Sequence, residues 1–233
     1  MSRLSRHGVT SKLVTLLSPH SAGVEAYRLL RTNLRYASVD KPLRSLAVTS
    51  ALAEEGKSLT AANLAISAAQ AGVRTLLVDA DLRKPAVHKL FAVPGHTGLT
   101  AVLVGLQKME DAIQPTQVDN LWLLVAGDKP PNPAEILQSE SMASLHRRLT
   151  GEFDFVVYDC PPVLPAVEAV DIGALADGAL VVVRAETTPK DAVQQALSQL
   201  AHGHVAMLGA VLNGVRAGSG YGYNYYSYGY GNA

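Results

Sequence analysis

The 233-residue sequence has little of several features that define other protein classes. A single cysteine, Cys160, excludes an internal disulfide framework and suggests a reducing compartment. No apolar run approaches the ~18–20 residues of a membrane-spanning helix, and the strongest run covers only residues 179–183. Twenty lysines and arginines balance twenty aspartates and glutamates, so no net charge favours nucleic acid or anionic lipid. These absences predict a soluble, cytoplasmic, single-domain protein.

The start of the sequence lacks both acids and an apolar stretch. Arg3, Arg6 and Lys12 precede the first acid, Glu25, without the hydrophobic region of a signal peptide. Ser2 stands where N-myristoylation requires glycine. We expect residues 1–20 to be a flexible basic arm, which is either a plain disordered leader or a segment that docks on a partner or a membrane surface.

Short apolar runs alternate with helical patterns after this arm. An amphipathic helix is expected from Ser21 to Ala37, with Ser21 as its cap. Further helices are expected over residues 57–71, 98–105, 133–149 (with Asn132 as N-cap), 167–176 and 191–201, and strands over residues 46–49, 75–79, 121–125, 155–159, 179–183 and 208–212. The strands are continuously apolar, as in a parallel sheet covered on both faces. The sequence therefore predicts an α/β fold with a doubly wound, mostly parallel sheet.

A phosphate-binding pattern follows the first expected strand. Residues 51–58 read Ala-Leu-Ala-Glu-Glu-Gly-Lys-Ser, which is the P-loop spacing with alanine in place of the first glycine. Such a loop aims backbone N–H groups and the positive end of a helix at phosphate oxygens. Lys57 would neutralise the β- and γ-phosphates, and the Ser58 hydroxyl would bind Mg²⁺. The position between a strand and a helix predicts binding of ATP or GTP.

Three acids stand at the carboxyl ends of two expected strands. Asp79 and Asp81 are two residues apart, so on an extended segment they face the same side, and Asp159 ends another strand. A single such acid is more often a turn or capping residue. Three of them near a polyphosphate require a cation, and Mg²⁺, bound directly or through water, supplies it.

The last eighteen residues have a composition unlike the rest. They hold five glycines, no acid and no aliphatic residue larger than alanine, so they cannot build a core. We expect residues 216–233 to be a disordered tail. Six of the nine tyrosines lie there: Tyr221, Tyr223, Tyr225, Tyr226, Tyr228 and Tyr230. The tail is either a phosphorylation substrate or a low-complexity segment without a signalling role.

Taken in order, these motifs resemble the cytoplasmic kinase domain of the bacterial tyrosine kinases, over nearly the whole chain. Residues 55–58 look like the family's Walker A motif, residues 77–85 like its Walker A′ and residues 155–162 like its Walker B. The tyrosine cluster resembles the family's autophosphorylation tail. Residues 25–31 are similar to the Glu-x-x-Arg-x-x-Arg helix through which the family forms rings, which implies that Glu25, Arg28 and Arg31 contribute to oligomerisation.

The resemblance implies a P-loop tyrosine kinase domain over residues 21–215 that phosphorylates the tail of a neighbouring copy. The implied catalytic residues are Lys57, Asp79, Asp81, Arg83 and Asp159. ATP would be bound by Ala53, Glu54, Glu55, Gly56, Lys57, Ser58, Leu59 and Asn213, and Mg²⁺ by Ser58, Asp81 and Asp159. Asp79 is the candidate acceptor of the tyrosine proton, and Arg83 would steady the acids or a phosphate. Asn213 is placed near adenine by family analogy, although Asn213-Gly214 alone reads equally well as a turn.

The same resemblance implies partners and a cellular role. The family forms rings and acts on protein tyrosines, and members without membrane spans work with a separate membrane-bound activator of polysaccharide export. We therefore expect regulation of capsule or exopolysaccharide synthesis, recruitment to the inner face of the plasma membrane, and no nucleic acid.

Two positions depart from the family pattern. Ala53 and Glu54 stand where the family usually has Pro-Gly. Glu54 lacks the freedom of glycine at positive φ and brings a negative charge close to the phosphates. Cys160 replaces a common threonine, and we interpret it as a small buried residue.

Two other functions fit parts of the pattern. A chromosome-partitioning or site-selection ATPase shares the P-loop class, but such proteins usually carry a signature lysine early in the loop, where this chain has Leu52. A non-catalytic nucleotide-binding adaptor with an adhesive tail is the second alternative. Phosphotyrosine formation with Mg·ATP separates both from a kinase.

Overall fold

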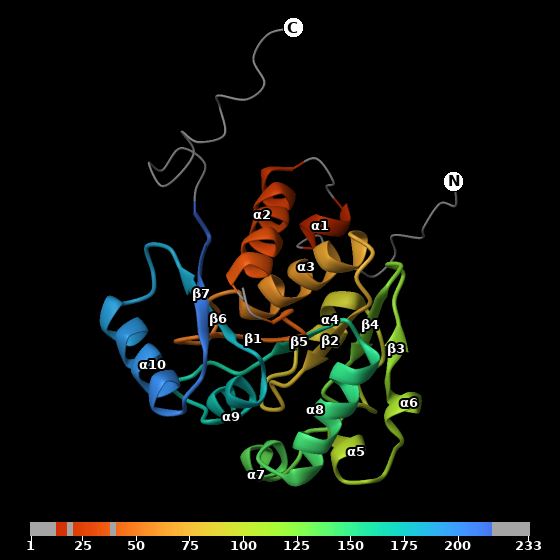
Figure 1. Ribbon diagram of the computed structural model, residues 1–233. Helices are drawn as coiled ribbons and strands as arrows, with labels where there is room; N and C mark the ends of the chain where they lie inside the picture. The colour runs from red at the N-terminus through yellow and green to blue at the C-terminus, as the bar shows by residue number, and fades with distance from the viewer. Residues whose placement is uncertain (1–12, 18–20, 38–40, 216–233) are drawn as a thin grey trace, which may run out of the picture.

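The computed structural model describes residues 13–17, 21–37 and 41–215, and a seven-stranded sheet forms its centre (Figure 1). The strands are β1 (Ser45–Ser50), β2 (Thr75–Asp79), β3 (Gln114–Pro115), β4 (Leu121–Leu124), β5 (Phe155–Asp159), β6 (Ala179–Arg184) and β7 (Met207–Asn213). Their order in the sheet is β3-β4-β2-β5-β1-β6-β7. All neighbours are parallel except β3 and β4. The predicted doubly wound, mostly parallel fold is confirmed.

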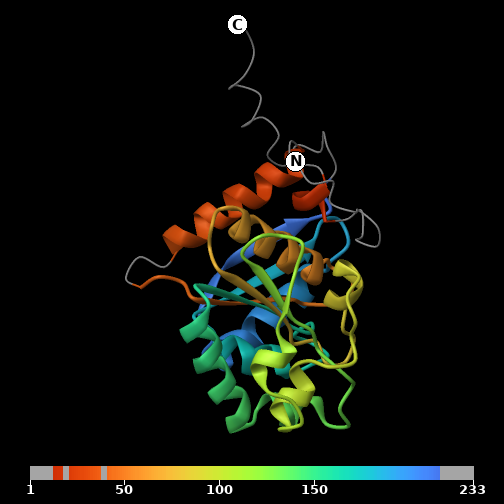
Figure 2. The same cartoon turned by 90° about the vertical axis from the view of Figure 1, so that its right-hand side faces the viewer.

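Helices cover both faces of this sheet (Figures 1 and 2). They are α1 (Val14–Leu17), α2 (Ala22–Ala37), α3 (Lys57–Gln70), α4 (Val87–Phe91), α5 (Leu99–Leu103), α6 (Met109–Ala112), α7 (Pro133–Leu137), α8 (Glu140–Glu152), α9 (Glu168–Leu175) and α10 (Lys190–His202). The central strands β1, β2 and β5 are buried along their whole length because helices shield them on both sides. Within the described residues, no helix has the length and apolar character needed to cross a bilayer.

Two hydrophobic cores result, one on each face of the sheet. The first joins α1, α2, α3 and α4 to side chains such as Leu46, Leu77 and Val157. The second joins α8, α9 and α10 to the alternate side chains of the same strands, such as Leu76 and Val156. The alanine-rich helix α3 lies close to the sheet, so the loop before it is held by a rigid strand on one side and a rigid helix on the other.

The expected flexible arm is wrong for residues 13–17. Leu13 is fully buried, and the backbone N–H and hydroxyl of Thr15 donate to Oδ1 of Asn63 on α3, at 3.1 and 2.8 Å. This segment therefore belongs to the folded body. The remaining residues of the arm lie outside the described part, as does the tyrosine tail from residue 216.

The helix expected over residues 133–149 is two helices, α7 and α8. Ser139 interrupts it, because its Oγ donates to the carbonyl of Ile136 and accepts the N–H of Met142 as the cap of α8. Asn132 occupies the position before α7, but its side chain donates to Glu135 instead of capping the helix. The sequence pattern also missed β3, a two-residue antiparallel edge strand that contains proline.

Candidate active site

The predicted P-loop connects β1 to α3, and its backbone is held in left-handed conformations at two positions. Gly56 has φ 95° and Glu54 has φ 65°. A Cβ atom at Gly56 would lie 2.0 Å from Nδ2 of Asn213, so only glycine fits there. Glu54 adopts the positive φ that the sequence analysis anticipated for this position, at a strain cost that glycine would not have. Ala53 and Glu54 are exposed, whereas Leu59 is partly buried in the first turn of α3.

Side chains from distant segments close this loop. The buried carboxylate of Glu55 accepts the N–H of Leu52 at 3.0 Å and the hydroxyl of Thr188. Nη1 of Arg184 donates to the carbonyl of Glu54 at 3.0 Å. Nδ2 of Asn213 donates to the carbonyl of Glu55 at 2.9 Å. Asn213 therefore supports the loop backbone, and Arg184 and Thr188 are contributors that the sequence analysis missed.

Lys57 is the centre of a buried cluster of opposite charges. Its ammonium nitrogen lies 2.8 Å from Oδ2 of Asp81 and 3.3 Å from Oδ1 of Asp159. The hydroxyl of Ser58 is 3.4 Å from the same nitrogen. Burial lowers the pKa of Lys57, but the charges of Asp159 and Asp81 outweigh it and raise the pKa above its ordinary value. The lysine is thus held as a cation at the N-terminus of α3.

Asp159 has capacity for a further partner. It is fully buried at the end of β5, and its Oδ2 has no hydrogen-bond partner among the described residues. Burial raises its pKa, while Lys57 and the Ser58 hydroxyl lower it. A buried carboxylate oxygen without a partner is costly unless a cation or a water fills the position. Asp159 and Ser58 offer oxygen atoms of the kind that Mg²⁺ prefers, although within the described residues no group of three or more His, Cys, Asp or Glu side chains could hold a metal ion.

Asp79 lies in the same region but faces backbone. Its Oδ2 accepts the N–H groups of Ala86 and Val87, at 3.0 and 2.9 Å, and its Oδ1 accepts that of Asp81 at 3.3 Å. Burial, followed by the charge of Asp159, raises the pKa of Asp79 to about 8 against these donors. The contacts give Asp79 a structural task, since it holds the segment that carries Asp81.

Arg83 does not join the acid cluster by a direct contact. Its Nε lies 2.7 Å from Oε1 of Glu168, a buried residue of the first turn of α9. The second oxygen, Oε2, has no hydrogen-bond partner within the described residues. Glu168 was missed because it begins a helix, away from the strand ends that identified the other acids.

The three residues of the expected oligomerisation motif fall into two groups. Glu25 and Arg28 form an exposed ion pair on α2. Nη1 of Arg31 instead donates to the carbonyl of Ser67 on α3 at 2.6 Å. Arg31 therefore fastens α2 to its own subunit, and Glu25 and Arg28 remain on the free face.

Cys160, singled out from the sequence, and its neighbour Tyr158 are buried at the end of β5. Cys160 is fully buried, and burial, followed by the charge of Asp159, raises the pKa of its thiol. Tyr158 is also fully buried and shares a 2.9 Å hydrogen bond with Nδ1 of His146. Both residues pack the core beneath the site.

A loop and a lysine at the head of a helix, facing acids at the ends of parallel strands, define a nucleotide-binding protein of the P-loop class. Residues 45–205 match the family model described as an AAA domain. The chain is 41% identical over 213 residues to tyrosine-protein kinase YwqD of Bacillus subtilis, covering 91% of this chain and 88% of the relative.

Solved structures agree. The kinase domain of Escherichia coli tyrosine kinase ETK aligns with a TM-score of 0.86 and 32% identity, covering 95% of this chain and 88% of that one. MinD from Pyrococcus horikoshii, solved with Mg-ADP, aligns with a TM-score of 0.62 and 26% identity over 72% of this chain and 69% of that one. The chain belongs to the bacterial tyrosine kinases, and the resemblance found in the sequence is confirmed.

Proposed function

We propose that this kinase uses ATP and Mg²⁺ at the Lys57 cluster to phosphorylate tyrosines, including the C-terminal cluster of a neighbouring copy. The observation that carries the proposal is the buried Lys57, held between Asp81 and Asp159 at the head of α3. ATP with Mg²⁺ supplies the phosphoryl group and a divalent charge when bound. The loop of residues 53–59 encloses the phosphates in this proposal, and Ser58, Asp81 and Asp159 hold the cation or its waters.

The protein residues act mainly by position and charge, since phosphoryl transfer needs little covalent help from the enzyme. Lys57 exchanges its carboxylate partners for phosphate oxygens as negative charge moves to the leaving oxygen. The contacts of Asp79 with backbone favour a positioning role over the proton-accepting role expected from the sequence. Arg83, neutralised by Glu168, steadies the segment that follows Asp81. Asn213 acts on the loop backbone in place of the adenine contact.

The tail is the proposed substrate. The domain over residues 21–215, extended by the packed residues 13–17, ends beside its own P-loop, where Asn213 contacts Glu55. Residues 216–233 carry six tyrosines and no acid, so nothing in their sequence repels the acids of a neighbour's site. Each phosphate adds about −1.5 to −2 charges, and this charge weakens a ring held by Glu25 and Arg28.

The wider role follows the family. A ring of copies, activated by a separate membrane-bound protein of polysaccharide export, regulates capsule or exopolysaccharide synthesis at the inner face of the plasma membrane. The basic residues Arg3, Arg6 and Lys12 provide the docking charge for that activator. The likeness to MinD raises the alternative of a site-selection ATPase, but Leu52 occupies the position of that class's early lysine.

Two complementary full-length variants test phosphorylation in trans. Lys57→Met removes the phosphate-binding charge and keeps the tail, whereas a variant with all six tail tyrosines changed to phenylalanine keeps the site. Neither alone should give tail phosphotyrosine with Mg·ATP. Mixed together, they should give phosphotyrosine on the Lys57→Met chain, detected by mass spectrometry of its C-terminal peptides. An unmodified tail in the mixture, with wild type modified in parallel, would refute transfer between copies.

A further inference from the structure

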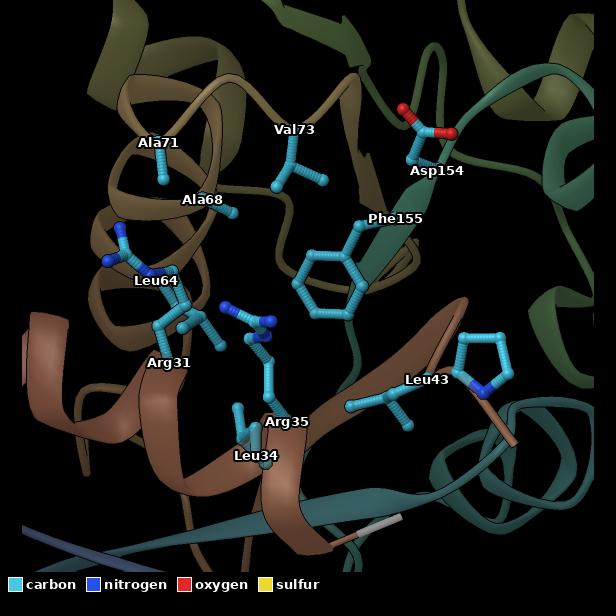
Figure 3. A pocket seen from close by; sticks show the side chains of 11 residues that line it. Arg31, Leu34, Arg35, Leu43, Leu64, Ala68, Ala71, Val73, Asp154 and Phe155 are labelled. Atoms are coloured by element: carbon cyan, nitrogen blue, oxygen red, sulfur yellow. The ribbon is translucent and has the colours of Figure 1, made fainter. Parts of the chain in front are cut away.

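A cavity of about 430 Å³ opens at the amino ends of the strands, opposite the P-loop edge (Figure 3). It lies between α2, α3 and the starts of β1 and β5, and we name it the amino-edge cavity. Leu34, Leu64 and Phe155 form much of its apolar wall, and two arginines of α2, Arg31 and Arg35, also line it. An apolar wall suits an apolar group, and two guanidinium groups suit an anion. A cavity that has both therefore suits a ligand with an apolar part and an anionic part.

The arginines are only partly neutralised by the protein. Arg31 uses Nη1 to reach Ser67, whose carbonyl and hydroxyl oxygens carry no net charge. Among the described residues, no carboxylate forms an ion pair with Arg35. Asp154 also lines the cavity, but its Oδ2 accepts the N–H of Arg74 at 3.3 Å. Figure 3 shows the Arg35 guanidinium between Arg31 and the Phe155 ring, with the Asp154 carboxylate pointing away from both arginines.

This arrangement fits a flat aromatic group that carries a dianion. A ring packs favourably against an aromatic side chain such as Phe155 and against aliphatic walls. Guanidinium groups match phosphate geometry better than ammonium groups, and two of them can share its oxygens. Phosphotyrosine combines both parts in one side chain, and the volume of the cavity accommodates it.

The chain itself carries the source of that side chain. Six tyrosines follow residue 215, and the last described strand, β7, ends against the P-loop of its own subunit. The tail therefore leaves from the carboxyl edge of the sheet, whereas the cavity lies at the amino edge. We propose that the amino-edge cavity binds a phosphotyrosine of the C-terminal segment of a second copy, a proposal that rests on the proposed phosphorylation of this tail.

Such binding would place the reaction product on α2, the helix whose free face carries Glu25 and Arg28. The cavity would then act as a receptor for the modified tail, separate from the site that modifies it. Unmodified tyrosine would be held weakly, since the ring alone leaves Arg31 and Arg35 without an anion.

A synthetic peptide tests the proposal without any kinase step. The peptide covers residues 219–226, is phosphorylated at Tyr223 and carries a fluorophore; the unphosphorylated peptide is its control. Fluorescence anisotropy with the full-length protein, without ATP, should show at least about tenfold tighter binding of the phosphorylated form. Arg35→Gln should weaken it at least about fivefold. Arg147→Gln, which removes the same charge from an exposed pair with Glu140 on α8, should leave it unchanged.

The other possible results distinguish binding at the amino-edge cavity from binding at the active site. Equal affinity for both peptides, or unchanged binding in Arg35→Gln and in the charge-reversed Arg35→Glu, would overturn the proposal. Binding lost in Lys57→Met but kept in Arg35→Gln would assign the phosphopeptide to the active site and would also overturn it. Normal phosphopeptide binding by a protein that never phosphorylates its tail would instead refute the proposed function and leave the binding site standing.

Discussion

The two edges of one parallel sheet use carboxylates in opposite ways. At the carboxyl edge, Asp81 and Asp159 are buried against the ammonium group of Lys57, and one oxygen of Asp159 has no partner in the described structure. At the amino edge, the exposed Asp177 accepts the N–H groups of Arg44 and Ser45 where β1 begins, at 2.9 and 2.8 Å. At the amino edge Asp177 satisfies the backbone, and at the carboxyl edge Asp79 does the same, whereas Asp81 and Asp159 direct their charge to Lys57 and Asp159 keeps an unpaired oxygen for a ligand.

The largest contrast should come from the two ends of β5. Asp159→Asn removes one of the two charges that hold Lys57 and the buried oxygen that suits a cation. Tyrosine phosphorylation should fall on the order of 10²–10³-fold, because charge stabilisation dominates this chemistry. Asp154→Asn, just before the same strand, should keep kcat within about twofold, since it touches only the amino edge. Steady-state kinase assays on both variants give the comparison. Equal losses of kcat would show that the two edges of the sheet do not differ in their importance for catalysis.

The role of Asp79 can be separated by pH. Its pKa is raised to about 8 in the folded state, above the ordinary ~4 of an unfolded chain, so the folded state holds the proton more tightly. This contribution to stability is full below pH 4 and is lost as the pH rises toward 8. The free energy of unfolding should therefore fall as the pH rises across that window.

Asp79→Asn should flatten this fall, as measured by urea titrations at pH 5, 6, 7 and 8. The asparagine variant should also keep at least about a tenth of kcat, because a positioning residue can be partly replaced by an amide. If the free energy of unfolding fell with pH equally in wild type and Asp79→Asn, Asp79 would not be the group that titrates in this range. A loss of kcat larger than a hundredfold at unchanged stability would restore Asp79 as the proton acceptor.

At the amino edge, loss of a carboxylate should affect stability and spare catalysis. Asp177→Ala removes the acceptor of two backbone N–H groups and of the Ser45 hydroxyl. We expect the free energy of unfolding to fall by about 2 kcal/mol, the scale of hydrogen bonds to a charged group. Thermal unfolding measures it, with Glu140→Ala in the exposed pair with Arg147 as a control that should change by less than about 0.5 kcal/mol. A drop in kcat per folded molecule would show that the edges are not independent.

A smaller effect concerns the P-loop backbone. Glu54→Gly relieves a left-handed conformation and should stabilise the protein by about 1 kcal/mol. It also removes a negative charge near the phosphates, so nucleotide should bind a few-fold more tightly. Glu186 has a similar φ, 61°, in the turn between β6 and α10. Glu186→Gly should therefore share the gain in thermal stability, and calorimetric titration with Mg·ADP should show a gain in affinity only for Glu54→Gly.

The smallest effect is expected in chemical labelling of Cys160, which should not react in the folded protein. Because burial raises the pKa of its thiol, a maleimide at pH 7.5 should fail to modify it in the folded protein and should modify it fully in guanidinium chloride. Mass spectrometry measures the added mass. Rapid labelling of the folded kinase would indicate that the carboxyl edge opens more than its packing suggests.

The sequence could predict most of the carboxyl edge. Continuous apolar runs identify buried parallel strands, and parallel strands place their ends together, so Asp81 and Asp159 are expected near a Gly-Lys-Ser loop. The same reasoning could not separate Asp79 from Asp81. Which carboxylate turns to the lysine depends on the backbone after β2, where the N–H groups of Ala86 and Val87 capture Asp79.

Contacts between distant segments were beyond the sequence pattern. Thr188 and Arg184 reach the P-loop from more than 120 positions along the chain, and no local periodicity marks them. Glu168 was likewise invisible as the partner of Arg83. By contrast, the folded segment 13–17 does carry a local signal, because Leu13, Val14, Leu16 and Leu17 are apolar within a polar stretch. The polar and basic composition of residues 1–20 as a whole does not reveal this apolar cluster.

The register between β2 and β5 has a consequence for how the gene can change. Asp79 pairs directly with Asp159 across the two parallel strands. Deleting or adding one codon within either strand would turn every following side chain to the opposite face and carry its acid out of the site. Length variation should therefore be lethal to activity inside these strands and harmless in a surface turn such as that around Gly105, where a Cβ atom would meet no neighbour. In a library of single-codon deletions, kinase activity should be lost throughout β2 and β5 and kept at this turn.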